Sequence, residues 1–159
     1  MAQTNVSGTI VSNTVWTVQN GPYIVTGDIL VASGATLTLQ PGLTVQMDAG
    51  TKIAVDGILD ARGSTTDSIF FISSSMLPVT GSWEGIQVAG SVGGLAEMDY
   101  CRIQHAATAV SVNGSVTGSH IVLRNTLLRH NAQAVANLLG NQEVRRCTFE
   151  SNTVAVEAC

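Results

Sequence analysis

The chain has 159 residues, the length of one ordinary domain, which is enough to bury a continuous core. Only 11% of the residues are charged, and Lys52 is the single lysine among seven basic residues, so we expect no nucleic-acid partner. Hydrophobic residues form 45% of the chain in runs far shorter than the ~18 apolar residues of a membrane-spanning helix, so we expect no membrane insertion.

The first residues lead directly into patterned sequence, without the basic and apolar regions of a signal peptide. We interpret this start as the result of a removed leader, because a lysine-poor chain rich in Thr, Asn and Gly is typical of an extracellular solenoid. Residues 1–20 are expected to form capping strands, with the segment from Val6 to Val18 covering the first coil.

Short apolar segments bounded by Gly, Pro, Asp or Asn predict strands through the first ninety residues. These segments are 23–25, 37–39, 43–47, 53–55, 69–72 and 85–88. Segment 27–34 also resembles segment 56–63 at an offset of 29 residues, since 56 minus 27 is 29. We interpret this as a loose repeat.

A clearer repeat occupies the C-terminal half. Residues 98–112 align without gaps to residues 123–137 at an offset of 25, and these align to residues 144–158 at an offset of 21. The columns expected to face inward are Cys101/Thr126/Cys147, Ile103/Leu128/Phe149, Ala109/Ala134/Ala155 and Val110/Val135/Val156. The columns between them, Arg102/Leu127/Thr148 and Gln104/Arg129/Glu150, are expected to face solvent.

Such short strands bury an inner face only when successive copies stack at the ~4.8 Å strand spacing. A coil of 21 to 25 residues therefore predicts an all-β fold, a right-handed parallel β-helix of about six to seven coils that forms a single domain over residues 1–159.

Residues 21–45 resemble the opening coils of bacterial extracellular right-handed β-helix repeat proteins. Segments 58–63, 69–74 and 81–88 are similar to the successive coils of that family. The resemblance implies the architecture of the pectate-lyase-like superfamily. It implies no single activity, because that superfamily includes polysaccharide lyases and hydrolases as well as adhesins and surface repeats.

His105 and His130 occupy equivalent positions of adjacent copies, so their side chains are expected to stack, and Ser151 holds the third position. A shared metal ion is one interpretation, but two histidines without a further ligand favour a solvated turn pair. Asn131 and Asn152 also align and are expected to form a structural asparagine ladder.

Charged residues align on the outer face of the repeat. Asp99, Arg124 and Arg145 share one column, and Arg129 lies beside Glu150. They form either a substrate-binding strip or ion pairs between coils, and we favour ion pairs. The aspartates of the N-terminal half, Asp48, Asp56 and Asp60, do not repeat over three coils as a lyase calcium site requires.

The three cysteines imply no disulfide framework. Cys101 and Cys147 are two coils, ~9.6 Å, apart, which is too far for a disulfide, and we expect both in the core. Cys159 stands at the chain end, and its role is open. Trp16 and Trp83 are too far apart in sequence to form an aromatic binding strip.

We therefore assign no catalytic, cofactor-binding or metal-binding residue and expect no cofactor. The favoured function is a non-enzymatic structural or binding module, extracellular or at the cell surface, with a glycan or cell-surface molecule as one partner class. The alternative is a polysaccharide-active lyase or glycoside hydrolase, or a fragment of one. Residues 154–159 end in mid-coil without a cap, which predicts either a longer parent protein or a homo-oligomer or filament formed end to end.

Overall fold

A computed structural model describes residues 3–89, 92–114, 120–138 and 142–157. Its elements are β1 Thr4–Ile10, β2 Thr14–Trp16, the 3-10 helix η1 Val18–Asn20, β3 Tyr23–Val31, β4 Thr36–Leu39, β5 Thr44–Met47, β6 Lys52–Val55, β7 Ile58–Arg62, β8 Ile69–Ser73, β9 Gly85–Ala89, β10 Leu95–Asp99, β11 Cys101–Gln104, β12 Thr108–Asn113, β13 His120–Arg124, β14 Leu127–Arg129, β15 Gln133–Ala136, β16 Glu143–Arg145, β17 Thr148–Glu150 and β18 Val154–Glu157. The strands expected in the N-terminal half are all present, each with one end shifted by a single residue, except that β3 extends six residues further, to Val31.

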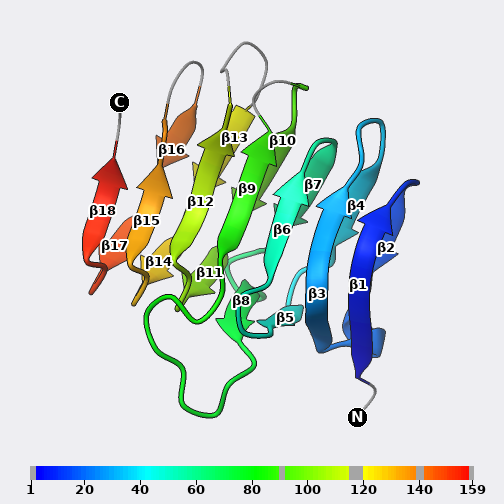
Figure 1. The fold of residues 1–159 in the computed structure, drawn as a ribbon, viewed down its shortest axis with the longest axis horizontal. Coiled ribbons are helices and arrows are strands. Elements are labelled where there is room, and N and C mark those ends of the chain that lie inside the picture. Colours follow the sequence, from blue (N-terminus) through cyan, green and yellow to red (C-terminus); the bar gives the residue numbers. More distant parts are fainter. Residues whose placement is uncertain (1–2, 90–91, 115–119, 139–141, 158–159) are drawn as a thin grey trace.

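The strands stack in parallel into about six coils, side by side along the long axis of the molecule (Figure 1). One face is a six-stranded sheet in the order β16-β13-β10-β7-β4-β2. The other strands form a twelve-stranded sheet in the order β17-β14-β11-β8-β5-β3-β6-β9-β12-β15-β18, with β1 paired to β3. The predicted β-solenoid architecture is therefore confirmed.

The long strand β3 joins two faces of the solenoid. Its first part pairs with β5 and its last part pairs with β6, so β3 turns the corner that later coils make with two separate strands. Strand β1 runs parallel to β3 on its other side, and β2 pairs with β4. Residues 4–20 thus supply the first members of both sheets, and the capping role expected of residues 1–20 stays a prediction.

The register of the C-terminal repeat is confirmed. Ile103 pairs with Leu128, and Leu128 pairs with Phe149, which gives offsets of 128 − 103 = 25 and 149 − 128 = 21. The repeat expected in the N-terminal half is wrong. Ile29 pairs with Ile53, and Ile58 pairs with Thr36 on the six-stranded sheet, so segments 27–34 and 56–63 lie on different faces. The two segments share an apolar pattern but occupy different positions within their coils.

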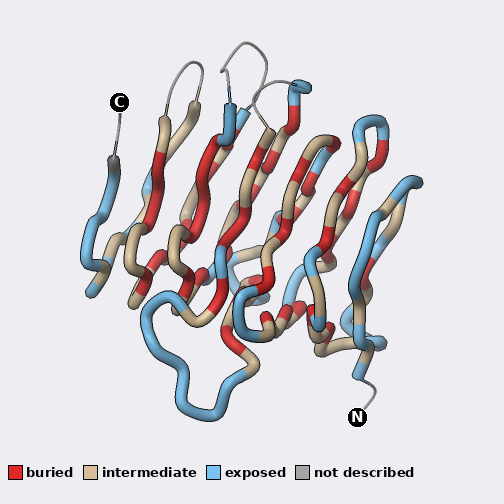
Figure 2. Tube along the Cα trace, in the orientation of Figure 1, coloured by how far each residue is buried: buried red, intermediate tan, exposed pale blue. Residues whose placement is uncertain are grey.

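The core runs along the axis of the solenoid, lined by alternate residues of the stacked strands (Figure 2). Both tryptophans belong to it: Trp16 stacks on Tyr23 at 4.7 Å between ring centroids, and the Trp83 indole N–H donates to the Gln104 carbonyl at 2.8 Å. Neither is part of a surface strip, as expected.

The inward columns expected for the repeat are buried in the first two copies but not in the third. Val110 and Val135 are fully buried, whereas Val156 is 43% exposed and Ala155 is also exposed. Phe149 is only partly buried. The expectation of a uniformly buried third copy is therefore wrong, because the last described coil has a neighbouring coil on one side only.

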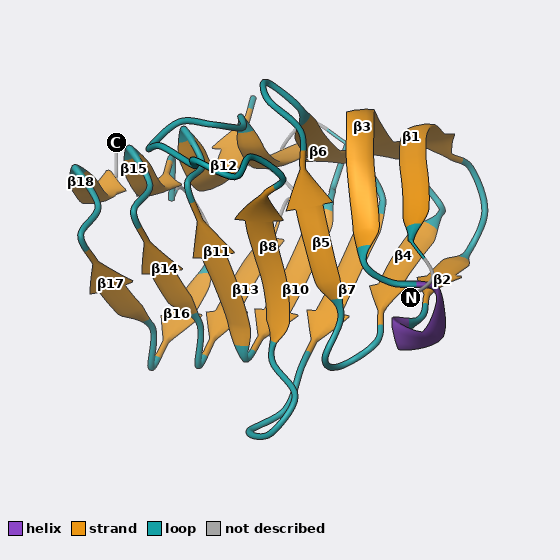
Figure 3. Cartoon of the chain, turned by 90° about the horizontal axis from the view of Figure 1, so that it is seen from below, coloured by secondary structure: helices purple, strands orange, loops and turns teal. Residues whose placement is uncertain are grey.

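In each C-terminal coil, two corners turn through a single left-handed residue. They lie before and after strands β11, β14 and β17, which face the viewer in Figure 3. The first corner uses Tyr100, Asn125 and Arg146, and the second uses His105, His130 and Ser151, all with φ between 48° and 64°. A non-glycine residue in this region costs about 1–2 kcal/mol, so the corners need compensating contacts. The turns that flank β5 use glycines instead, Gly42 and Gly50.

Candidate functional site

The outer face of the six-stranded sheet carries two adjacent columns of charged side chains. Strand pairing aligns Asp60 with Glu97, and Glu97 with Val122, which in turn aligns with Glu143. The next outward column is Arg62/Asp99/Arg124/Arg145. Side chains on one face of a sheet alternate with the buried ones, so these groups all point away from the core.

Glu143 is the centre of this charged face. The guanidinium of Arg124 donates to both of its carboxylate oxygens, from Nε at 2.9 Å and from Nη2 at 3.1 Å, and Nε of Arg145 lies 3.3 Å from Oε1. Arg124 also lies 3.6 Å from Glu97. The hydrogen bonds from Arg124 lower the pKa of Glu143, and the same contact raises the pKa of Arg124.

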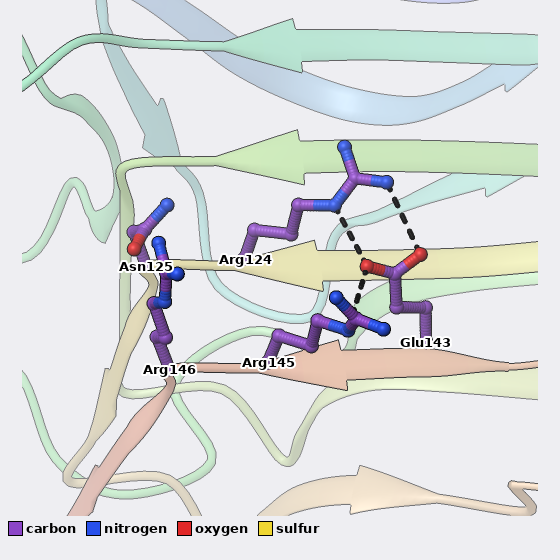
Figure 4. Close-up of a pocket in the computed structure, with 5 residues that line it drawn as sticks. All are labelled: Arg124, Asn125, Glu143, Arg145 and Arg146. Atoms are coloured by element: carbon purple, nitrogen blue, oxygen red, sulfur yellow. Dashed lines mark hydrogen bonds and ion pairs between the residues drawn. The ribbon is translucent and has the colours of Figure 1, made fainter.

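A pocket of about 360 Å³ opens beside this ion pair, lined by Arg124, Asn125, Glu143, Arg145 and Arg146. Figure 4 shows Arg124 and Arg145 turned toward Glu143, with Arg146 extended beside Asn125. Arg146 precedes β17 at a left-handed corner, and Asn125 precedes β14 at the equivalent corner of the preceding coil, so the stacking places both at the same end of the six-stranded sheet. Within the described part of the chain, Arg146 makes no ion pair or hydrogen bond.

The expected column of Asp99, Arg124 and Arg145 is confirmed, and ion pairs between coils are present on this face. The preference for ion pairs over a substrate-binding strip stays a prediction. The partners differ from those expected, because Asp99 accepts a hydrogen bond from Asn125 at 2.8 Å while the arginines pair with glutamates. The other expected pair, Arg129 with Glu150, is present at 3.9 Å.

Sequence reasoning missed Glu97, Glu143 and Arg146. The two glutamates stand one residue before the first and third copies of the repeat, so extending the alignment by one position would have revealed them. Arg146 aligns with Asn125, a neutral residue, and no column of like residues marks it.

His105 and His130 stack as expected, with ring centroids 5.6 Å apart and planes 9° from parallel. Burial lowers the pKa of His105, and the neighbouring His130 and Arg129 lower it further. The rings line a shallow depression under Pro78, Val79 and Thr80. The described residues include no group of three His, Cys, Asp or Glu side chains placed to hold a metal ion. The expectation that this pair binds no metal stays a prediction.

The asparagine ladder is confirmed. Asn131 is fully buried; its Oδ1 accepts from the Ala106 amide at 2.9 Å, and its Nδ2 donates to the Ile103 carbonyl at 3.2 Å. Asn152 repeats the pattern one coil later: it accepts from the Asn131 amide at 3.0 Å and donates to the Leu128 carbonyl at 2.8 Å. These bonds satisfy backbone groups of the left-handed corner.

Of the two described cysteines, only Cys101 lies in the core as expected. Both are free thiols, and burial raises the pKa of each. The thiol of Cys101 donates to the Ala61 carbonyl at 3.1 Å. Cys147 is half-buried, which corrects the expectation that it belongs to the core, because no described coil covers it beyond β17. Cys159 lies outside the described residues.

Comparison with known proteins agrees with the fold. A family model for a pectate-lyase-like β-helix domain matches residues 8–111. Protein bark beetle of Drosophila melanogaster is 34% identical over 68 residues, which are 43% of this chain and 2% of that protein. No solved structure matches the chain significantly, and no described helix has the length and apolar character needed to cross a membrane. The match over most of its length shows that the chain belongs to the family of pectate-lyase-like β-helix domains.

Proposed function

We propose that this chain is a non-enzymatic β-solenoid module with a structural or binding role. The observation that carries the proposal is the engagement of Glu143, whose carboxylate accepts two hydrogen bonds from Arg124 of the preceding coil and lies 3.3 Å from Nε of Arg145. A general acid for glycosidic bond cleavage needs a carboxyl whose pKa is raised, and the pKa of Glu143 is lowered. Glu97, Asp99 and Glu143 instead contact side chains of a neighbouring coil.

The neighbouring carboxylates support the same conclusion. Asp60 accepts two hydrogen bonds from Arg62, at 2.7 and 2.6 Å, and Asp99 accepts one from Asn125. Each of these acids is thus engaged by a neighbouring donor, and Arg124 ties β13 to β10 through Glu97 and to β16 through Glu143. Such exposed pairs contribute little stability one by one, and their main effect is to fix the register of the face.

The alternative, a polysaccharide lyase or hydrolase, is tested directly. The protein is incubated with neutral and uronate polysaccharides while new reducing ends and unsaturated products are measured. We expect no product above the heat-denatured sample. Product formation that the Glu143→Gln variant abolishes would overturn the proposal and would make this face an active site.

We further propose an extracellular or cell-surface location, with a glycan or another surface molecule as the partner class. The support is compositional: a single lysine and a surface built largely from uncharged polar residues. Protease treatment of intact source cells tests the location, because an exposed protein is digested while an intracellular marker survives. Protection of the protein in intact cells would contradict it.

End-to-end association of two copies is the third part of the proposal. Strands β16, β17 and β18 each pair on one side only within the described residues, and Val154 and Val156 are each 43% exposed there. Edge strands of this kind accept a further parallel strand. Sedimentation over a range of concentrations should show dimers or larger species that Val156→Lys disrupts. A monomer at every concentration would overturn this part of the proposal.

A further inference from the structure

The pocket beside Glu143 has more positive than negative charge on its walls. Three guanidinium groups line it, and a single carboxylate, Glu143, lies among them. Glu143 is shared by Arg124 and Arg145, while Arg146 has no partner in the described chain. Positive charge therefore remains uncompensated at one end of the pocket, where Arg145 and Arg146 lie.

The free donors of the pocket lie at that same end. Arg145 contacts Glu143 through Nε, which leaves its two terminal nitrogens without a described partner. Asn125 uses one bond of its amide group toward Asp99 and has a second N–H to donate. Arg146 extends beside Asn125, so donors from β14's corner and β17's corner face the same space (Figure 4).

Planar guanidinium groups match oxyanions such as carboxylate and sulfate, which they bind through paired, charge-assisted hydrogen bonds. The surroundings limit the charge of the ligand. Glu97, Asp99 and Glu143 lie on the same face, and the chain carries a net charge of −4, so a polyanion or a dianion meets repulsion. A group with one negative charge fits the remaining excess.

We propose that Asn125, Arg145 and Arg146 form a binding site for a single monoanionic oxyanion group, a carboxylate or a sulfate ester. Arg146 supplies the unpaired charge and Asn125 supplies a neutral donor. Glu143 acts as an internal competitor, because it occupies Arg124 and part of Arg145. The site goes beyond the structural role proposed above, and it lies on β16 and at the corner before β17, beside the edge assigned there to end-to-end association.

The test uses acetate and methyl sulfate as monoanionic probes and inorganic sulfate as the dianion, each titrated against chloride at constant ionic strength. Heteronuclear NMR follows the Nε–H signals of the arginines. We expect both monoanions to shift the signals of Arg145 and Arg146 saturably, and the stronger of the two identifies the ligand source. Equal, unsaturable shifts at all arginines would overturn the proposal.

Variants sharpen the test. Arg146→Ala should weaken binding about tenfold, the value of one charge-assisted hydrogen bond. Glu143→Gln should strengthen binding several-fold and should favour the dianion most, because it removes the competing negative charge. Arg102→Ala is the matched control, since Arg102 lies over the Phe70 ring on another face.

Thermal melts confirm that each variant folds. Unchanged affinity in Arg146→Ala, or weaker binding in Glu143→Gln, would refute the site.

Discussion

The second and third copies of the C-terminal repeat carry matching side chains in register, and they differ in what lies beside them. Val135 packs between Val110 and Val156 and is fully buried, whereas Val156 has a described partner on one side only and is 43% exposed. Asn131 and Asn152 differ in the same way. Burial in a solenoid therefore depends on the neighbouring coil as much as on the residue.

The largest difference between the two copies is expected for a charge placed in their shared valine column. Val135→Asp puts an unpaired carboxylate in the core and should prevent folding. Val156→Asp, in the same column, places the charge at a partly solvated position and should leave the chain folded. Circular dichroism with urea titration measures both. Equal losses of stability would show that the last coil is as well covered as the inner one.

The asparagine ladder should show a smaller difference in the same direction. Asn131→Ala removes three side-chain bonds and leaves buried backbone groups of Ala106 and Ile103 unpaired, which should cost about 2–4 kcal/mol in free energy of unfolding. Asn152→Ala affects a half-buried site open to water and should cost about 1 kcal/mol. Chemical denaturation gives both values, and a greater loss for Asn152 would contradict the comparison.

Thiol labelling extends the comparison, without mutation, to the first and third copies, because the second copy has Thr126 at the cysteine position. Cys101 should react with an alkylating reagent only when the chain unfolds, because burial both shields its thiol and raises its pKa. Cys147 is half-buried and should be labelled earlier, in native conditions. Mass spectrometry of labelled peptides over time measures the two rates. Matching rates would show that the last coil is protected as fully as the inner coil.

The smallest effect is expected for Glu143, which ties the two copies together across the outer face. Its folded-state pKa lies below the ordinary value of 4.5, so its contribution is present above that value and is lost as the pH falls through the lowered pKa. The melting temperature of Glu143→Gln should therefore fall slightly below that of the parent at pH 7, and the gap should close in acid. A difference in melting temperature that widens below pH 4 would contradict the prediction that the ionised form of Glu143 stabilises the fold.

How much the sequence could predict depended on the lengths of the turns. In the C-terminal half the two left-handed corners of each coil are short, and the offsets of 25 and 21 residues located the columns of the repeat correctly. In the N-terminal half the offsets vary: Thr36 pairs with Ile58 at 22 residues, and Ile58 pairs with Leu95 at 37. With offsets this variable, two segments with similar apolar patterns align in sequence although they lie on different faces of the solenoid. Ile29 and Ile58 are such a pair.

The candidate pocket could be predicted only in part. Arg124 and Arg145 were found because a column of charges repeats across coils. Arg146 was not, because its position depends on the left-handed corner before β17, and the equivalent residues are Tyr100 and Asn125. A site made of unlike residues at one corner has no periodic signal in the sequence and becomes visible only when the coils are stacked.

The parallel stacking has a mechanical consequence. The hydrogen bonds between coils run along the solenoid axis, across the strands (Figure 1). Tension applied to the two ends of the stack loads the bonds of one coil at a time, so the chain peels rather than shears. Each released coil of 25 residues adds up to ~90 Å of extended chain, taking about 3.6 Å per residue. A solenoid of this kind lengthens in steps set by its coil period and yields first at its most weakly covered coil.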